Sequence, residues 1–451
     1  MDKKRGNFSG SMGFVLAAAG SAVGLGNLWR FPYLAAQYGG GIFILVYIIL
    51  ALTFGFALLS TEIAIGRKTG SSPVLAYKKL NKKFSFLGYL AILVPIIILP
   101  YYCVIGGWVT KYVTVYAQGL ASAAAGETYF SDFISNPWAP LVFFLIFICA
   151  TATVVLLGVE KGIEKISKFL MPILILLTLG ICIYTATLPN AIEGIKYYLV
   201  PDFSKFSFKT ITSACGQLFY SISIAMGIMI TYGSYTKKDV NLSKSVNHIE
   251  IFDTIVALLA GFMVVPAVFI FSGEAGLQTS GPGLMFMTLP KVFESMPAGN
   301  IIGLLFFVLV FFAAITSSIS VMEAIVSSII DKFNIGRKTA CFIVIGVSIL
   351  LGIPSSLGNG VWADIKILGM DFLTFFDYLS NSVIMPIVAI CTCILVGWVI
   401  KAKTITDEIT RNGEKFGRKG LYEVMIKYVC PVLLAIIVIV STLTQFGIIS
   451  V

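Results

Sequence analysis

The chain has 451 residues, of which 58% are hydrophobic and only 12% are charged. A soluble domain of this length would need more polar side chains to cover its surface, so the composition excludes the common soluble classes. The net charge of +10 would suit a nucleic-acid partner, but the placement of the basic residues argues against one.

Eleven apolar runs recur along the sequence, and most have the length of about 20 residues that crosses roughly 30 Å of hydrocarbon. They predict an all-α polytopic membrane protein with a single transmembrane domain over residues 1–451. The runs lie at about 12–37, 41–65, 87–118, 138–158, 167–188, 211–235, 249–273, 301–330, 339–354, 370–400 and 427–449.

The basic residues alternate with these runs. When the N-terminus is placed in the cytoplasm, 25 of the 32 lysines and arginines fall in cytoplasmic segments. This distribution is the positive-inside bias, so the charge reports orientation in the lipid bilayer and no nucleic acid is expected. With eleven spans, we expect a multi-pass inner (plasma) membrane protein with its C-terminus outside.

Two of the predicted spans are interrupted at the same depth. The first contains three glycines within residues 20–26, each costing about 1 kcal/mol in a helix interior. The sixth is interrupted at 221–227, also about ten residues into its run. This spacing is typical of inverted repeats with a discontinuous helix in each half. Close helix packing through small residues is the alternative, which Asn27 and Ser221 disfavour as hydrogen-bonding groups in lipid.

The spans also contain oxygen atoms that could bind sodium. They include the carbonyls freed at the first break, the Asn27 side chain, the Ser221 hydroxyl and three consecutive hydroxyls at 316–318. Those three could instead bond to carbonyls of their own helix. Asp253 is harder to explain by packing, because a carboxylate at mid-membrane costs at least about 2.5 kcal/mol unless it faces a cation or water.

Residues 20–32, Gly-Ser-Ala-Val-Gly-Leu-Gly-Asn-Leu-Trp-Arg-Phe-Pro, followed by three glycines at 39–41, resemble the first-span signature of the neurotransmitter:sodium symporter family. The resemblance covers nearly the whole chain and is nearest to short bacterial members of the multi-hydrophobic amino-acid transporter type. It implies a 5+5 inverted-repeat, LeuT-like fold with broken helices 1 and 6. The repeats would be 12–188 and 211–400, with an eleventh transmembrane helix at 427–449.

The resemblance also implies site residues. The first sodium site would use Ala22, Asn27, Ser221 and Asp253, and the second would use Gly20, Val23, Ala313, Thr316 and Ser317. The substrate would contact Ala22, Leu25, Gly26, Ile98, Tyr102, Tyr220, Ser221, Ser223, Met226, Ser317 and Val321. The gating ion pairs would be Arg30 with Asp377 outside, and Arg5 with Asp331 inside. Solvated surface charges are the alternative for Arg5 and Asp331.

By this resemblance the chain is expected to import a hydrophobic or aromatic L-amino acid with sodium, by alternating access. Two sodium ions per substrate are expected. Chloride-dependent relatives carry asparagine where Asp253 stands and serine where Ala257 stands, so transport is expected to be independent of chloride. Ala225 occupies a position often held by glycine, which leaves the size of the pocket open.

Three rival functions are weighed against this one. A proton-coupled exchanger would need a titratable group in the middle of span 5, and residues 169–188 contain no charged side chain. An ion channel would conduct without stoichiometric transport of amino acids. An enzyme is disfavoured because the sequence suggests no nucleophile and base pair. A monomer is compatible with the sequence, which does not decide between monomer and dimer.

Overall fold

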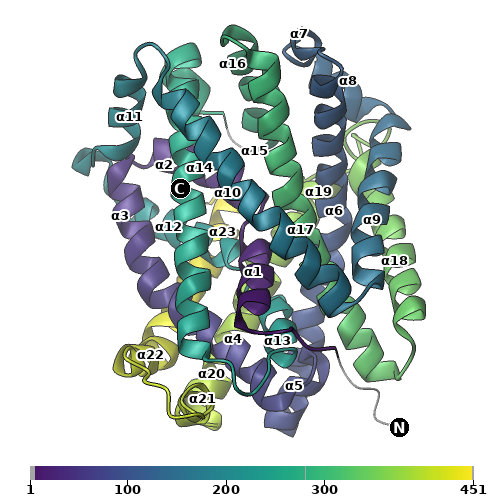
Figure 1. Cartoon of the computed structure of the whole chain (residues 1–451), viewed down its shortest axis with the longest axis vertical. Helices are drawn as coiled ribbons and strands as arrows, with labels where there is room; N and C mark the ends of the chain where they lie inside the picture. Colours follow the sequence, from purple (N-terminus) through teal and green to yellow (C-terminus); the bar gives the residue numbers. More distant parts are fainter. Residues whose placement is uncertain (1–5, 280, 449–451) are drawn as a thin grey trace.

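The computed structural model describes residues 6–279 and 281–448, and within them the chain is built from helices that run mostly along one direction (Figure 1). The long helices that surround the site are α3 (Gly41–Leu50), α4 (Phe56–Thr69), α6 (Ser85–Ala117), α9 (Ala139–Leu156), α10 (Lys165–Ala186), α14 (Leu242–Leu277), α17 (Gly299–Phe333), α18 (Arg337–Leu357), α20 (Met385–Ile394) and α23 (Cys430–Gln445).

Shorter helices lie at the two ends of the bundle. The end away from the N-terminus has α7 (Ala121–Ala124), α8 (Tyr129–Ser135), α11 (Ala191–Leu199), α15 (Gly281–Gly283), α16 (Leu289–Ser295) and α19 (Phe372–Asp377). The end near the N-terminus has α5 (Pro73–Leu80), α21 (Lys403–Ile409) and α22 (Lys419–Val424). π-helical turns adjoin several of the long helices, namely η2 (Ala51–Gly55), η4 (Val159–Glu164), η7 (Tyr378–Ile384), η8 (Leu395–Val399) and η9 (Met425–Val429). One more, η6 (Leu284–Thr288), joins the short helices α15 and α16. Two single 3₁₀ turns complete the chain, η3 (Lys82–Phe84) and η5 (Phe203–Lys205).

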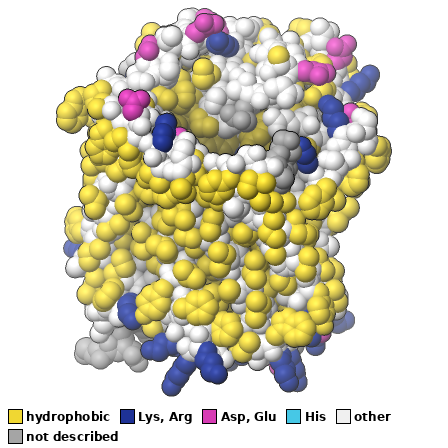
Figure 2. All heavy atoms as spheres, turned by 180° about the vertical axis from the view of Figure 1, so that it is seen from behind, with side chains coloured by type: hydrophobic (Ala, Val, Ile, Leu, Met, Phe, Trp, Pro, Cys, Tyr) yellow, Lys and Arg dark blue, Asp and Glu magenta, His cyan; other side chains and the backbone are white. Residues whose placement is uncertain are grey.

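The surface has the form expected of a protein in a bilayer. On the face shown in Figure 2, apolar side chains make a broad band across the middle, and lysines and arginines gather at the end that carries α5, α21 and α22. In the described residues, 9 helices are long and apolar enough to cross a membrane, or up to 10 when one bent pair is counted as a single span. The chain is therefore an all-helical, multi-span membrane protein, whereas the sequence predicts eleven spans.

The first predicted span is broken where its glycines lie. Helix α1 (Ser11–Ala22) ends before residues 23–25, and a π-helical turn η1 (Gly26–Arg30) then leads into α2 (Phe31–Gln37). The two halves are bent by 53°. Helix α1 lies near the centre of the bundle and contacts α10, α14 and α17, so the break is surrounded by protein.

The sixth predicted span is divided by a longer break. Helix α12 (Phe208–Ser221) and helix α13 (Ile228–Ser234) are separated by residues 222–227, which are not helical. Three residues of this segment have positive φ, and two of them, Ser223 (54°) and Ala225 (60°), are not glycine. At 14 residues, α12 rises about 21 Å, so it is too short to cross the bilayer alone, and this explains the difference in span count.

Helix α13 packs against α4 with almost no side chain between the backbones. A Cβ atom on Gly66 would lie 2.0 Å from the carbonyl oxygen of Ile230, and one on Gly233 would lie 2.3 Å from that of Ile63. Small residues that allow such close approach are a common way for helices to associate in lipid. This contact fixes α13, the second half of the broken sixth span, beside α4.

Candidate functional site

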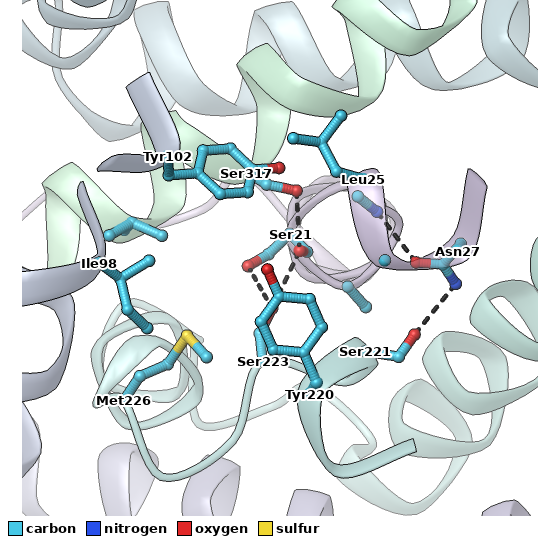
Figure 3. A pocket seen from close by; sticks show the side chains of 14 residues that line it. Ser21, Leu25, Asn27, Ile98, Tyr102, Tyr220, Ser221, Ser223, Met226 and Ser317 are labelled. Atoms are coloured by element: carbon cyan, nitrogen blue, oxygen red, sulfur yellow. Dashed lines mark hydrogen bonds between the residues drawn. The ribbon is translucent and has the colours of Figure 1, made fainter. Parts of the chain in front are cut away.

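A cavity lies where the two helix breaks meet, and residues of both breaks line it. Figure 3 shows side chains from both breaks, from α6 and from α17 around it. All eleven residues predicted to contact the substrate line this cavity, and the other three residues of its lining are Ser21, Gly24 and Asn27. The predicted set comes from four different parts of the sequence, so the fold itself brings the set together.

The residues predicted for the first sodium site form a buried polar cluster beside this cavity. The Nδ2 atom of Asn27 donates to the Ser221 hydroxyl at 3.0 Å and to Oδ1 of Asp253 at 2.8 Å. The Ser221 hydroxyl also donates to Oδ1 of Asp253 at 2.8 Å. Asn27 and Asp253 have no exposed surface, so the carboxylate is held by neutral donors in a site without bulk water. A carboxylate in such surroundings favours a bound cation.

The second predicted set lies between α1 and α17. The Ser317 hydroxyl donates to the carbonyl oxygen of Val23 at 3.2 Å and to that of Ser21 at 3.1 Å, so it joins the two helices. The Thr316 hydroxyl bonds within its own helix, to the carbonyl of Ala313 at 3.1 Å. A Cβ atom on Gly20 would lie 3.4 Å from Cβ of Thr316. All five predicted residues therefore belong to one contact region.

The sequence left open whether the hydroxyls at 316–318 bind an ion or bond to carbonyls of their own helix, and the three residues differ in their contacts. Thr316 bonds to carbonyls of its own helix, and Ser318 bonds to Ile315 and to the hydroxyl of Thr151 at 2.8 Å. Only Ser317 among the three donates across to α1. Back-bonding therefore accounts for part of this run, and Ser317 is the member that makes the interhelical contact.

The Tyr102 hydroxyl lies inside the cavity, buried and with no hydrogen-bond partner among the described residues. A Cβ atom on Gly24 would lie 3.3 Å from this hydroxyl and 2.8 Å from Oγ of Ser317, so glycine keeps the space between them open. Leu25 and Gly26 start the second half of the broken helix, where backbone amides have no partner within the helix. An unpaired buried donor beside a helix N-terminus suits an anionic group such as a carboxylate.

Three of the four predicted gate residues, Arg30, Asp377 and Asp331, lie within the described residues. Arg30 stacks over the ring of Tyr220, with 5.7 Å from its Cζ to the ring centroid. Asp377 accepts hydrogen bonds from the Tyr101 hydroxyl at 3.1 Å and from Asn381 at 2.7 Å. Among the described ion pairs there is none between Arg30 and Asp377 within 4.0 Å.

On the opposite side, the backbone amide of Ser72 donates to Asp331 at 2.8 Å. Arg5, the residue predicted to pair with Asp331, lies outside the described residues.

Three residues outside the predicted set support the breaks. Gln217 donates from Nε2 to the carbonyl of Gly26 at 3.0 Å, and Oε1 of Glu62 accepts from the amide of Ala225 at 2.6 Å. The Tyr47 hydroxyl donates to Asp253 at 3.5 Å. Glu62 and Gln217 are buried polar side chains in apolar helices, and that property is the sequence signal that could have identified them.

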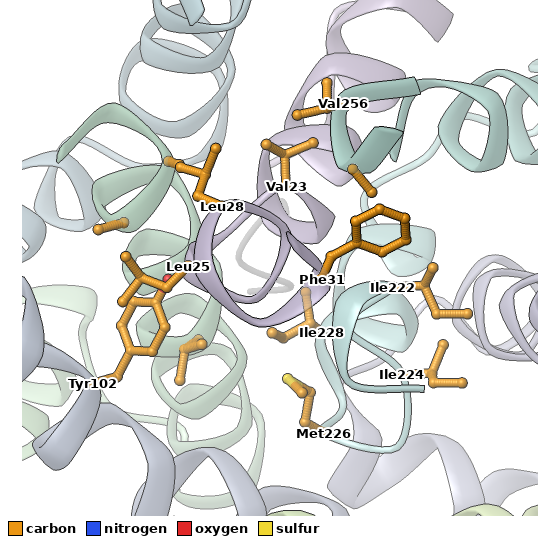
Figure 4. Close-up of a cluster of buried hydrophobic side chains, with 14 of the residues drawn as sticks. Val23, Leu25, Leu28, Phe31, Tyr102, Ile222, Ile224, Met226, Ile228 and Val256 are labelled. Carbon is orange, nitrogen blue, oxygen red and sulfur yellow. The ribbon is translucent and has the colours of Figure 1, made fainter. Parts of the chain in front are cut away.

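Apolar side chains close the space around the broken first span. In Figure 4, Val23, Leu28 and Phe31 of this span are flanked by Ile222 and Val256 from the neighbouring helices. All five are at most 2% exposed. This packing keeps water away from the polar cluster and strengthens electrostatic interactions within it.

Comparison with known proteins agrees with this geometry. The profile of the sodium:neurotransmitter symporter family matches residues 5–135 and 134–448. A Bacillus subtilis protein described as an uncharacterized sodium-dependent transporter, YhdH, is 35% identical over 100% of this chain and 99% of its own length. The sodium- and chloride-dependent taurine transporter of Rattus norvegicus is 27% identical over 90% of this chain and 73% of its own length.

A crystal structure of MhsT in complex with L-phenylalanine has the same fold, with a TM-score of 0.87 and 35% identity, over 97% of this chain and 99% of that one. Sequence profile, relatives and structure therefore agree over almost the full length. The chain belongs to the sodium:neurotransmitter symporter family and is a sodium-dependent transporter, not an enzyme.

Proposed function

We propose that this transporter imports a hydrophobic or aromatic L-amino acid together with sodium, by alternating access to the cavity between the two helix breaks. The observation that carries the proposal is the composition of that cavity. An unpaired Tyr102 hydroxyl and a half-helix N-terminus lie on one side, and Ile98, Met226 and Val321 supply apolar surface. A free amino acid has matching parts, a carboxylate and an apolar side chain. The 35% identical MhsT was crystallised with L-phenylalanine, which supports the same substrate class here.

Two sodium ions accompany the substrate in this proposal. The first is bound by Asn27, Ser221, Asp253 and the carbonyl of Ala22, and the second by carbonyls of α1 and α17 with the hydroxyls of Thr316 and Ser317. The first group is close enough to the cavity for a bound carboxylate to complete the coordination of the ion. Substrate and sodium would then each raise the affinity for the other, as coupled transport requires.

The carboxylate of Asp253 makes chloride unnecessary in this proposal. It is fixed in the first cluster, and Ala257 lies one helical turn further along α14 without exposed surface. A permanent negative charge there balances the sodium charge, which an asparagine could not do. We expect uptake to persist when chloride is replaced by gluconate.

The proposed topology has eleven spans in a bacterial inner membrane, with two five-span inverted repeats at 12–188 and 211–400 and a final span at 427–449. The two breaks at equivalent positions support the repeats. The lysines and arginines at the end that carries the N-terminus support a cytoplasmic N-terminus (Figure 2). The gates are assigned to Arg30 with Asp377 outside and Arg5 with Asp331 inside, each pair closing in turn.

Uptake of radiolabelled L-phenylalanine into proteoliposomes tests the proposal. We expect accumulation with an inward sodium gradient and none with potassium in its place. Tyr102→Phe should raise KM for the amino acid by about tenfold, because one hydrogen bond to a charged group is lost. Equal uptake with sodium and potassium would disprove the coupling. A protein that binds sodium but takes up neither L-phenylalanine nor any other hydrophobic L-amino acid would disprove the substrate class.

A further inference from the structure

We propose that Glu164 is a positioning residue that latches the N-terminal end of α1 in the state with the cavity closed toward the N-terminal side, and that opening this side requires the latch to break. The inference rests on the proposed function, because it assigns a role within alternating access. It concerns a carboxylate outside both sodium clusters and outside the predicted gates.

Glu164 is the last residue of η4, the π-helical turn that leads into α10 and the fifth predicted span. Its carboxylate is only 2% exposed, yet it accepts hydrogen bonds from a residue 155 positions away in the sequence. The backbone amide of Ser9 donates to Oε2 at 2.8 Å, and the Ser9 hydroxyl donates to Oε1. Ser9 directly precedes Gly10, the N-cap of α1. The carboxylate therefore holds the chain at the point where α1 begins.

Two lysines complete the contact. Lys168 forms an ion pair with Oε1 of Glu164 at 2.6 Å and donates to the Ser9 hydroxyl at 3.2 Å. Lys237, in the loop after α13, donates to the Ser9 carbonyl at 2.8 Å. Ser9 is thus held by groups from the fifth and sixth spans together. Lys168 is 43% exposed, so its charge is screened, and the hydrogen bonds from Ser9 to the buried Glu164 carboxylate contribute most of the stabilisation.

Helix α1 is shaped to receive this carboxylate. A Cβ atom on Gly13 would lie 2.2 Å from Oε1 of Glu164 and 2.3 Å from its Cδ, so only glycine lets the carboxylate lie against the first turn of α1. By contrast, a Cβ atom on Gly10 would have no atom within 4 Å. The negative charge also lies at the N-terminus of α1, where the helix dipole favours it.

The element that carries Glu164 can change shape. It is preceded by Gly158, its N-cap, which has φ +89°, and a Cβ atom on Gly162 would lie 2.1 Å from the carbonyl of Val154. A π-helical turn is less regular than an α-helix and is often found at functional positions. Unwinding of η4 would withdraw Glu164 from Ser9, while Ser9 is exposed and could exchange its hydrogen bonds for water. The latch therefore couples the start of the fifth span to the position of α1.

Spin labels on α1 and α17 test the latch directly. Met12 is 67% exposed on α1 and Phe333 is 66% exposed at the end of α17, so cysteines at these two positions accept labels, in a Cys149→Ser background. In wild type we expect one short interlabel distance with sodium and L-phenylalanine, and a second, longer distance in potassium.

Glu164→Ala and Gly13→Ala should each increase the ratio of long to short distances in sodium by about tenfold or more. Glu164→Ala removes the acceptor of the Ser9 hydrogen bonds, and the methyl group of Gly13→Ala displaces the carboxylate from Ser9. Gly10→Ala is the matched control and should leave the ratio at the wild-type value. Glu164→Gln, which keeps an acceptor for the Ser9 amide, should fall between wild type and Glu164→Ala.

The double variant distinguishes a latch from general loss of stability. Once Glu164 is alanine, a methyl group at residue 13 no longer meets a carboxylate, so Gly13→Ala should add little to Glu164→Ala. Additive effects, or wild-type distances in both single variants, would overturn the latch. Failure of the proposed function would look different, because the wild-type distances themselves would then not respond to sodium or phenylalanine.

Discussion

Gly26 shows at the residue scale how the absence of a side chain makes room for a substrate. A Cβ atom there would lie 2.8 Å from Cδ1 and Cε1 of the Tyr220 ring, and that ring lines the cavity. We expect Gly26→Ala to raise KM for the amino acid by about fivefold or more, as an overpacking cost of about 1–3 kcal/mol implies. Gly180→Ala is the matched control, because a Cβ atom at Gly180 has no atom within 4 Å. Saturation uptake curves of both variants check this, and equal KM values would contradict it.

Asp253 is the one carboxylate in the first polar cluster. Asp253→Asn keeps the shape of the side chain and removes its charge, so we expect the sodium concentration for half-maximal uptake to rise by about tenfold or more. Uptake at varied sodium, with the ionic strength held constant by potassium, measures this change. An unchanged sodium dependence would show that the cation is bound elsewhere.

Residue identities in the site were predictable where a motif lies inside an apolar span, as for Asn27, Tyr102 and Ser221. They were predictable because a polar group in lipid is energetically costly, and the family signature assigns these groups to a binding site. The contact of Glu62 with the amide of Ala225 could not be predicted from the sequence, because Ala225 lies in a non-helical segment whose path only the fold determines. Periodicity along one helix carries no information on such a partner.

At the element scale, α21 is fastened to α4 by a buried ion pair. Nε of Arg67 lies 2.8 Å from Oε1 of Glu408, and Arg67 also donates to the carbonyl of Val240 at 2.6 Å. Both side chains of the pair are at most 4% exposed. Without Arg67, Glu408 keeps only its longer ion pairs with Lys238 at 4.0 Å and Arg411 at 3.7 Å. Because its closest cation is lost, Arg67→Met should lower the free energy of unfolding by about 3 kcal/mol.

The control for this pair is a double variant. Replacing Glu408 with Gln as well should recover part of the loss, since no full charge then remains buried without a partner. Thermal unfolding of the four proteins in detergent measures the coupling. Losses that simply add would contradict a direct interaction between these side chains.

The elements themselves were predicted to different degrees. Apolar runs located the long helices well, because lipid requires about 20 apolar residues in every span. Residues 401–427 were interpreted from their charge as a connecting segment, and the structure places α21 and α22 within it. Those helices are short and stabilised by partners such as Arg67, 341 residues away from Glu408, so no local pattern reveals them.

For the whole molecule, the proposed function couples the energy of the sodium gradient to uptake of the amino acid at the two helix breaks. Two sodium ions that enter with one amino acid, each down a tenfold gradient and 100 mV, release about 7 kcal/mol together, against about 3.7 kcal/mol for one. In the proposed cycle, ions and substrate share one site that closes in turn at either end, which allows that energy to be used because neither solute crosses alone.

The number of sodium ions can therefore be read from the steady state of the whole transporter. At zero membrane potential, the accumulation ratio of the amino acid should rise with the square of the sodium ratio, and with the first power if only one ion is coupled. Proteoliposomes clamped with potassium and valinomycin, at sodium ratios from about 2 to about 10, should give a logarithmic slope of about 2, since each ion contributes its own gradient term. A slope near 1 would remove one of the two proposed sites, and Thr316→Ala and Asp253→Asn in the same assay would show which one remains.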